Sequence, residues 1–416
     1  MSGDKRLAFV GDDPAFDWLK LPQVQALFKL LNRDGEEVRI VGGAVRNSLL
    51  GMVVKDFDCA ATAEPSLVMH WAHDADVRVL PTGLDHGTVT LLIDDMAFEV
   101  TTLRTDVETD GRHAQVAFGR DWSVDAHRRD FTMNAVYLDK DGCLHDPTGC
   151  GIEDARLRVV RFIGNADRRI AEDYLRILRF FRFYAQYGEN FRREDYRACI
   201  AAQKSLSTLS AERVGVEMVK LVQGPFAMAA LHAMHVGGML GDVLGSVPRL
   251  SRFSGLLRLA SSLRLKPDLS LLLTALCVEV EEDAQRVAKT LRLPNRIRDI
   301  MVRLVRGYRS VNDPSEAAIQ TLAYLHGKEV ATSMIMLAIV DRRLDPDLTE
   351  LSMELHGLEL WSVPDFPISG RDLLDHGMAP GPEVGSCLSR LEARWVKSGF
   401  ALTRSELLSA KLMKCL

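Results

Sequence analysis

The chain has 416 residues, too many for one ordinary domain, and its 47% hydrophobic and 26% charged residues are typical of a globular protein. Its apolar runs fall short of the ~20 residues that a membrane-spanning helix needs, and its seven scattered cysteines, with no C-x-x-C pair, predict free thiols in the reducing cytoplasm. The formal net charge of −5 excludes any argument from bulk charge to nucleic acid, although residues 156–213 carry thirteen Lys/Arg against seven Asp/Glu.

The N-terminal third alternates between strand-like and helix-like patterns. Residues 38–41 predict a strand, and residues 44–50 predict a short helix after a diglycine. A second strand is expected over residues 55–60. Residues 87–93 and 97–102 predict a hairpin, because two strand-like runs flank a short turn.

The segment from Thr105 to Asp121 is polar and has no sustained hydrophobic period, which predicts a long loop. Long loops inside compact domains are usually functional. The character changes after Pro147, and beyond Ala171 apolar residues recur at spacings of three and four. We therefore expect an α/β head followed by a long helical region.

Two neighbouring features carry the chemistry. Gly42-Gly43 precedes a predicted helix, so backbone amides and the positive helix N-terminus can approach a phosphate. Asp56 and Asp58 lie two residues apart on a predicted strand and so share one face. Two like charges there are costly unless a cation neutralises them, and Mg²⁺ favours carboxylate and phosphate oxygens. Each feature alone is usually structural, but their conjunction predicts a site for a metal-bound polyphosphate.

This segment resembles the active-site signature of the tRNA nucleotidyltransferase (CCA-adding enzyme) and bacterial poly(A) polymerase family, class II, within the polymerase β-like nucleotidyltransferase superfamily. Further segments match the family in order: Phe98–Arg104, Asp110–His113, Arg128–Ala135, Asp146–Gly149, Glu172–Arg179 and Ser210–Arg213. The resemblance is strong to about residue 220, and Ile368–Leu373 and Pro380–Pro382 match the family's C-terminal region.

The resemblance implies an α+β nucleotidyltransferase head with a palm-like mixed or antiparallel sheet, followed by an elongated all-α neck, body and tail. The expected boundaries are residues 1–155 for the catalytic head, 156–225 for the neck with its nucleotide-selecting motif, and 226–416 for the tRNA-binding body and tail.

The resemblance also assigns roles near the metal and the triphosphate. Asp56 and Asp58 would bind two Mg²⁺ ions that activate the RNA 3′-hydroxyl and stabilise the leaving pyrophosphate. Glu99 is either a third carboxylate near the metals or a solvent-facing residue of its hairpin. The triphosphate would be held by Gly42, Gly43 and Arg46, with support from Arg104 unless that arginine is only structural.

Other motifs would contact the nucleoside. Arg129 and Asp130 would contact the nucleotide, with Asp130 accepting from a ribose hydroxyl, unless the two form an internal ion pair. Asn134 would cap or brace the same element.

In the motif Glu172-Asp173-x-x-Arg176, residues three apart share a helix face. Asp173 and Arg176 would therefore present an acceptor and a donor to cytosine or adenine, and Arg179 would set their orientation. Uracil and guanine place a carbonyl where the amine belongs, and such a mismatch is strongly rejected.

These roles imply template-independent addition of C, C and A to the 3′ end of tRNA, using CTP and ATP. The partners implied are the tRNA acceptor end and elbow, with neither DNA nor a membrane. The alternatives are a poly(A) polymerase, an A-only enzyme, or an RNA-binding protein with an inactive head. The segment from Thr105 to Trp122, associated in this family with the switch from C to A, argues against a CC-only enzyme.

Two residues depart from the family pattern. Asn47 stands where the family usually has Asp, and Cys150 interrupts the family's usual turn. We expect Asn47 to alter a local contact with the turn rather than metal ligation.

Overall fold

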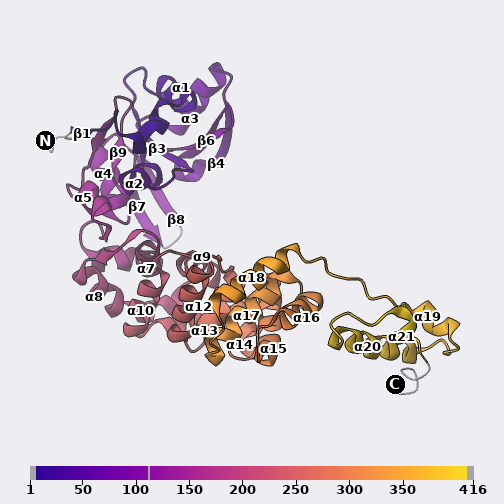
Figure 1. Ribbon diagram of the computed structural model, residues 1–416. Coiled ribbons are helices and arrows are strands. Elements are labelled where there is room, and N and C mark those ends of the chain that lie inside the picture. Colours follow the sequence, from indigo (N-terminus) through magenta and orange to yellow (C-terminus); the bar gives the residue numbers. More distant parts are fainter. Residues whose placement is uncertain (1–5, 111–112, 410–416) are drawn as a thin grey trace. The chain divides into compact units, whose positions relative to one another are not determined.

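The computed structural model describes residues 6–110 and 113–409. The chain divides into two compact units, Met1–Val243 and Leu244–Leu416. Among the described residues, all strands belong to the first unit and the second unit contains helices without strands (Figure 1). This agrees with the expected α+β head followed by helices.

An eight-stranded sheet with the order β1-β10-β9-β2-β3-β6-β5-β4 forms the centre of the first unit. Only β3 and β6 pair in parallel; every other neighbouring pair is antiparallel. The strands are β1 (Arg6–Phe9), β2 (Val38–Val41), β3 (Phe57–Ala61), β4 (Arg78–Gly83), β5 (Thr88–Ile93), β6 (Met96–Thr102), β9 (Tyr137–Leu138) and β10 (Cys143–His145). The predicted mixed sheet is confirmed, although β3 begins at Phe57 and leaves Asp56 just outside the strand.

The two faces of this sheet serve different purposes. On one face, Phe57, Cys59, Phe98 and Val100 join a large apolar core with helices α1 (Pro22–Leu31), α2 (Gly43–Leu49) and α3 (Pro65–Asp74). Because successive side chains of a strand point to opposite faces, Asp58 and Glu99 stand on the other face, which carries a smaller core that includes Ala60. The polar chemistry is thereby kept away from the main core.

The predicted loop from Thr105 to Asp121 is wrong. Residues here form β7 (Arg104–Asp110) and β8 (His113–Phe118), an antiparallel ribbon that is separate from the main sheet, followed by helix α4 (Trp122–Arg128). A two-stranded ribbon with no sheet to continue need not alternate apolar and polar residues, so the period-2 signal that reveals a half-buried strand is missing from its sequence.

The remaining elements of the first unit are mostly helices. They are α5 (Gly151–Arg156), β11 (Val159–Val160), α6 (Ala166–Glu172), α7 (Leu175–Tyr187), β12 (Asn190–Phe191), α8 (Arg193–Ala201), α9 (Ala211–Val222) and α10 (Ala227–Val236), with α11 (Leu240–Leu244) at the boundary. The expectation that Asp173 and Arg176 share one helix is wrong. Asp173 has extended backbone (φ −157°, ψ 107°) between α6 and α7, and its side chain accepts from the amide of Leu175. This position favours an aspartate, because its carboxylate accepts from a backbone N–H at the helix start that has no partner within the helix.

The regular elements of the second unit, as far as residue 409, are all helices. They are α12 (Leu250–Ser262), α13 (Leu269–Cys277), α14 (Glu281–Thr290), α15 (Asn295–Gly307), α16 (Glu316–His326), α17 (Lys328–Arg342), α18 (Leu348–Leu360), α19 (Gly370–Asp375), α20 (Pro382–Lys397) and α21 (Arg404–Leu407). None of the helices in the described part of the chain has the length and apolar character to cross a bilayer.

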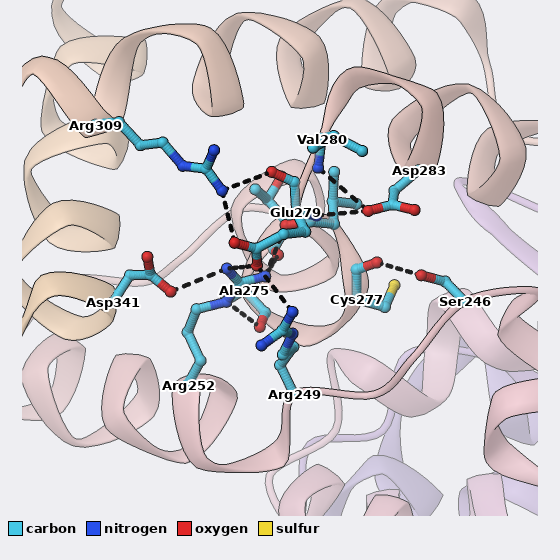
Figure 2. A network of polar contacts seen from close by, with 12 residues as sticks. Ser246, Arg249, Arg252, Ala275, Cys277, Glu279, Val280, Asp283, Arg309 and Asp341 are labelled. Carbon is cyan, nitrogen blue, oxygen red and sulfur yellow. Dashed lines mark hydrogen bonds and ion pairs between the residues drawn. The ribbon is translucent and has the colours of Figure 1, made fainter.

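A buried arginine ties the centre of this unit together (Figure 2). Arg252 of α12 is 6% exposed and donates to the carbonyls of Thr274, Ala275 and Val278 at 2.7–2.8 Å. It also pairs with Glu279 at 3.2 Å and with Asp341 of α17 at 3.1 Å. The last carbonyls of a helix have no partner within it, so Arg252 closes the C-terminal end of α13 and links it to α17.

Candidate active site

A cavity of about 1230 Å³ opens in the first unit. Eleven of the residues predicted from sequence line it, namely Gly42, Gly43, Arg46, Asp56, Asp58, Arg129, Asp130, Asn134, Asp173, Arg176 and Arg179. Its lining has eight Lys/Arg and four Asp. Such a cavity attracts a polyanion while retaining carboxylates that can hold a cation.

The acidic side of the cavity comes from the start of β3. Asp56 and Asp58 are exposed, whereas Phe57 and Cys59 are buried, so the two carboxylates share one face. Asp58 is the direct register partner of Glu99 on the parallel strand β6. Desolvation by the surrounding protein raises the pKa of the Asp58 carboxyl, and the negative charge of Glu99 raises it further. Crowded carboxylates of this kind are relieved by a bound cation.

Opposite the carboxylates, α2 begins at the diglycine. Gly42 has φ +71°, a conformation that glycine adopts at no steric cost. A Cβ added to Gly42 would lie 3.8 Å from an Asp58 carboxylate oxygen and 3.8 Å from the carbonyl oxygen of Asn134. The turn is thus held close to both, as a backbone that receives a phosphate must be.

Arg46 is the most buried of the cations that line the cavity. It is 6% exposed and donates to the side-chain oxygen of Asn134 at 2.7 Å and to that of Asn47 at 2.9 Å. Burial lowers the pKa of its guanidinium, although an arginine of such high intrinsic pKa stays charged. Asn47 also donates to the carbonyl of Val53 at 3.2 Å. Asn47 therefore connects Arg46 to the backbone of the segment that follows α2.

Asp130 is engaged by several protein partners. One oxygen accepts from the amide of Phe131 at 2.9 Å and from Asn134 at 3.0 Å, and the other accepts from Arg179 at 2.8 Å. Burial would raise the pKa of the Asp130 carboxyl, but Arg179 and these hydrogen bonds outweigh it and lower the pKa to about 2. Asp130 is therefore an ionised acceptor at any physiological pH.

Arg129 pairs with Asp125 of α4, at 3.1 Å, rather than with Asp130. Its Nε also lies 3.3 Å from the Tyr137 hydroxyl. Arg129 and Asp130 therefore do not pair with each other. Arg129 pairs with Asp125 of α4, and Asp130 pairs with Arg179 of α7. Both pairs fix side chains along the cavity wall.

The residues expected to select the base also have protein partners. Asp173 accepts from Arg213 of α9 at 2.6 Å. Arg176 donates to Glu172 and, at 2.6 Å, to the carbonyl of Arg169. A carboxylate has about four acceptor sites and a guanidinium has five N–H donors, so both groups keep bonding capacity for a base.

Two of the predicted residues do not line the cavity, although one of them, Glu99, is the register partner of Asp58. Glu99 and Arg104 are absent from the lining of this cavity among the residues that the structure describes. Arg104 begins β7 and is paired in register with Phe118.

Several lining residues were not predicted: Asn47, Lys55, Arg182, Phe183, Tyr187, Arg213 and Lys220. Arg182 continues the three-residue spacing of Arg176 and Arg179, a signal that could have found it. Arg213 and Lys220 come from α9, which only tertiary packing brings to the cavity.

The arrangement of the side chains limits how many protein ligands a metal ion could have. Within residues 6–110 and 113–409, no group of three or more His, Cys, Asp and Glu side chains gathers closely enough to hold a metal ion. A pair of carboxylates, however, is the usual protein share of a Mg²⁺ site, because substrate phosphates and waters supply the rest.

Comparison with known proteins places the chain in a family. Residues 38–161 match the family model of the poly A polymerase head domain, and residues 268–410 match that of tRNA nucleotidyltransferase domain 2 (putative). The mitochondrial CCA tRNA nucleotidyltransferase 1 of Mus musculus is 34% identical over 411 residues, covering 95% of this chain and 91% of that protein. The CCA-adding enzyme of Geobacillus thermodenitrificans is 33% identical over 409 residues, covering 95% and 98%.

A solved structure agrees. The crystal structure of the Bacillus stearothermophilus CCA-adding enzyme in complex with CTP superposes with a TM-score of 0.77 at 29% identity, covering 97% of this chain and 98% of that one. With a relative that is similar along nearly its whole length, and with the predicted residues gathered around one cavity, the chain belongs to the tRNA nucleotidyltransferase (CCA-adding enzyme) family.

Proposed function

We propose that this protein adds C, C and A to the 3′ end of tRNA, without a nucleic-acid template, using CTP and ATP and releasing pyrophosphate. The observation that carries the proposal is one cavity lined by an exposed Asp56–Asp58 pair, a diglycine helix start and a row of arginines from α7. The relatives named above, a CCA tRNA nucleotidyltransferase and a CCA-adding enzyme, match nearly the whole chain and support the same activity.

The carboxylates fit a divalent cation. Asp56 and Asp58 would hold Mg²⁺, with two ions proposed, because two carboxylates on one exposed face, with Glu99 beside Asp58, gather negative charge that a cation relieves. When bound, Mg²⁺ activates the attacking hydroxyl and neutralises charge on the triphosphate. Glu99 lies beside Asp58 in the sheet, and we keep its role as a third carboxylate as part of the proposal.

The protein's own groups would bind and orient the nucleotide. Amides at Gly42 and Gly43 and the guanidinium of Arg46 receive the triphosphate. In the reaction, the 3′-oxygen of the RNA bonds to the α-phosphorus, the bond to the bridging oxygen breaks, and pyrophosphate leaves. Asp130, held ionised, accepts from a ribose hydroxyl while Arg179 and Asn134 keep it in position. Arg104, outside the cavity lining, would act on the triphosphate only through the field of its charge.

The base would be read by Asp173 and Arg176. Asp173 accepts the exocyclic amine of cytosine or adenine, and Arg176 donates to the ring nitrogen beside it. Because Arg213 holds Asp173 and Glu172 holds Arg176, the two groups are oriented before a nucleotide arrives. Preorganised partners discriminate more strongly, since a wrong base leaves them unpaired.

We further propose the division of labour expected from the sequence. Residues 1–155 would catalyse, residues 156–225 would select the nucleotide, and residues 226–416 would hold the tRNA acceptor end and elbow, chiefly through phosphate and shape. A cytoplasmic location is proposed as well. The six cysteines of the described residues are free thiols, four of them buried, which supports a reducing compartment.

The decisive experiment offers the purified protein tRNAs that lack the whole CCA, lack only the final A, or are complete. Each nucleotide is supplied separately and in pairs, with magnesium. Incorporation of two C residues and then one A, followed by arrest, supports the proposal. Unlimited use of ATP on any RNA would make the protein a poly(A) polymerase. Use of ATP only on tRNA ending in CC would make it an A-only enzyme, and no incorporation would leave an RNA-binding protein with an inactive head.

A further inference from the structure

The strongest local excess of positive charge in the second unit lies where α14 meets α15. Residues 285–306 carry seven Lys/Arg and one acid, Asp299, in a chain whose net charge is −5. α14 and α15 pack against each other (Figure 1), so this charge is concentrated on one part of the fold.

Several of these cations are already matched by protein groups. Arg306 makes two bonds to Glu281, both at 2.5 Å, and Arg286 pairs with Asp283. Nearby, the network of Figure 2 matches Arg249, Arg252 and Arg309 with Glu279 and Asp341. Of these paired cations, only Arg252 is buried, and its carboxylate partners are what stability alone requires of a buried charge.

Other cations of this segment lie at the α14–α15 turn. A cavity of about 430 Å³ opens there, lined by three cations, Lys289, Arg292 and Arg298, and by the amides Gln285 and Asn295. Among the described residues, no Asp or Glu lines it. Arg298 bonds Asp299 outside the lining, but that carboxylate is 60% exposed, and an exposed pair is cheap to rearrange.

The turn itself adds to the attraction for an anion. α15 starts at Asn295 after Pro294, with no side-chain cap and no acidic residue in its first turn. Its first amides thus point out of the helix start beside the cavity, where the helix dipole favours negative charge. The contrast with the active-site cavity decides the ligand class: four Asp there call for a cation, whereas the charged residues that line this cavity are all cations.

We infer that the α14–α15 cavity is a binding site for a backbone phosphate of RNA, and that it holds the tRNA substrate without taking part in the chemistry. This inference rests on the proposed function for its choice of RNA. An exposed guanidinium, an ammonium and amide donors recognise a phosphate without reading a base. The site should therefore contribute affinity that is independent of tRNA sequence and sensitive to salt.

The test removes two charges with the double variant Lys289→Gln/Arg298→Gln in the full-length protein. Binding of a tRNA lacking CCA is measured by fluorescence anisotropy at a series of KCl concentrations, and CTP incorporation is measured at varied tRNA. We expect the Kd and the KM for tRNA to rise about tenfold, and the slope of log Kd against log salt to fall by one to two units. At saturating tRNA, kcat and the KM for CTP should stay unchanged.

The matched control is Arg258→Gln/Lys266→Gln, which removes the same two residue types from exposed positions of the same unit outside this cavity. The control should bind tRNA within about twofold of the parent. Equal tRNA binding by the parent and the Lys289/Arg298 variant would overturn the inference, as would equal weakening by the control. The inference would also be overturned, in favour of a small-anion site, if the Lys289/Arg298 variant bound tRNA like the parent but was no longer stabilised by inorganic phosphate in thermal melts. An active parent in any of these outcomes leaves the proposed catalytic function standing, so the two failures are distinguishable.

Discussion

The guanidinium of Arg46 lies over the ring of Tyr187, with 3.9 Å between its central carbon and the ring centroid. Arg46 belongs to α2, which follows the diglycine, and Tyr187 is the last residue of α7, the helix that carries Arg176 and Arg179. A cation–π contact therefore connects the triphosphate side of the cavity to the helix proposed to select the base.

Replacing this ring should weaken nucleotide binding. Tyr187→Leu removes the π face that orients Arg46, and such contacts contribute about 0.5–2 kcal/mol. We expect the KM for both CTP and ATP to rise by about 2-fold to 30-fold. Tyr187→Phe, which keeps the face, should behave like the parent. An equal rise in both variants would show that the hydroxyl, not the ring face, matters.

The Asp58 carboxylate on β3 should be required for catalysis but not for binding RNA. Asp58→Asn keeps the shape and removes the charge that a metal ion needs, so CTP incorporation should fall by at least about 100-fold. The affinity for tRNA, measured by filter binding, should stay within about twofold.

Glu99→Gln separates the two interpretations of Glu99, the register neighbour of Asp58. A comparable loss of activity would identify a third metal carboxylate. Activity close to that of the parent would leave Glu99 as a residue that only modulates the pKa of Asp58.

Base selection should depend on Arg213 as well as on Asp173. Asp173→Ala removes the acceptor for the exocyclic amine, so misincorporation of UTP and GTP should rise. Arg213→Gln leaves the acceptor but frees it from its 2.6 Å partner, and we expect an intermediate loss of selectivity. Competition between CTP and UTP in single-turnover assays measures both. Unchanged selectivity in Asp173→Ala would remove this residue from base recognition.

The buried arginine of the second unit should be a large contributor to stability. Arg252→Met removes the buried cation that pairs with Glu279 and Asp341 and the guanidinium that donates to three carbonyls. Removing one member of a buried charge network typically costs about 3–5 kcal/mol. Urea unfolding should show a loss of this size, whereas Arg258→Met, at an exposed position with one bond to Ser254, should cost less than about 0.5 kcal/mol.

One buried carboxyl should make stability depend on pH. Asp195 is 2% exposed and accepts from the amide of Phe162 at 2.9 Å; burial raises its pKa to about 6. Since the folded pKa lies above the unfolded value of ~3.9, the folded state binds the proton more tightly. The stabilisation from this group is complete below the unfolded pKa and is lost as the pH rises through 6.

The difference in unfolding free energy between the parent and Asp195→Asn isolates this effect, because other titrating groups cancel. We expect the variant to gain about 1.4 kcal/mol relative to the parent between pH 5 and pH 8. A difference that does not change with pH would mean that Asp195 titrates near its ordinary value.

Local sequence alone determined the parts of this protein whose signal is local. The diglycine before α2, the hairpin of β5 and β6 and the apolar spacing of α7 follow from turn chemistry and periodicity. Eleven predicted residues line one cavity because their motifs come from the segments that build it.

Tertiary structure alone decided which residues these groups would meet. Asp130 pairs with Arg179, which is 49 positions away, and Asp173 pairs with Arg213, 40 positions away. Neither pairing leaves a periodic trace, because periodicity records only which face of an element is buried. The ribbon of β7 and β8 escaped prediction for a related reason: strand pairing satisfies backbone groups whatever the side chains, so a strand outside a packed sheet carries no pattern to read.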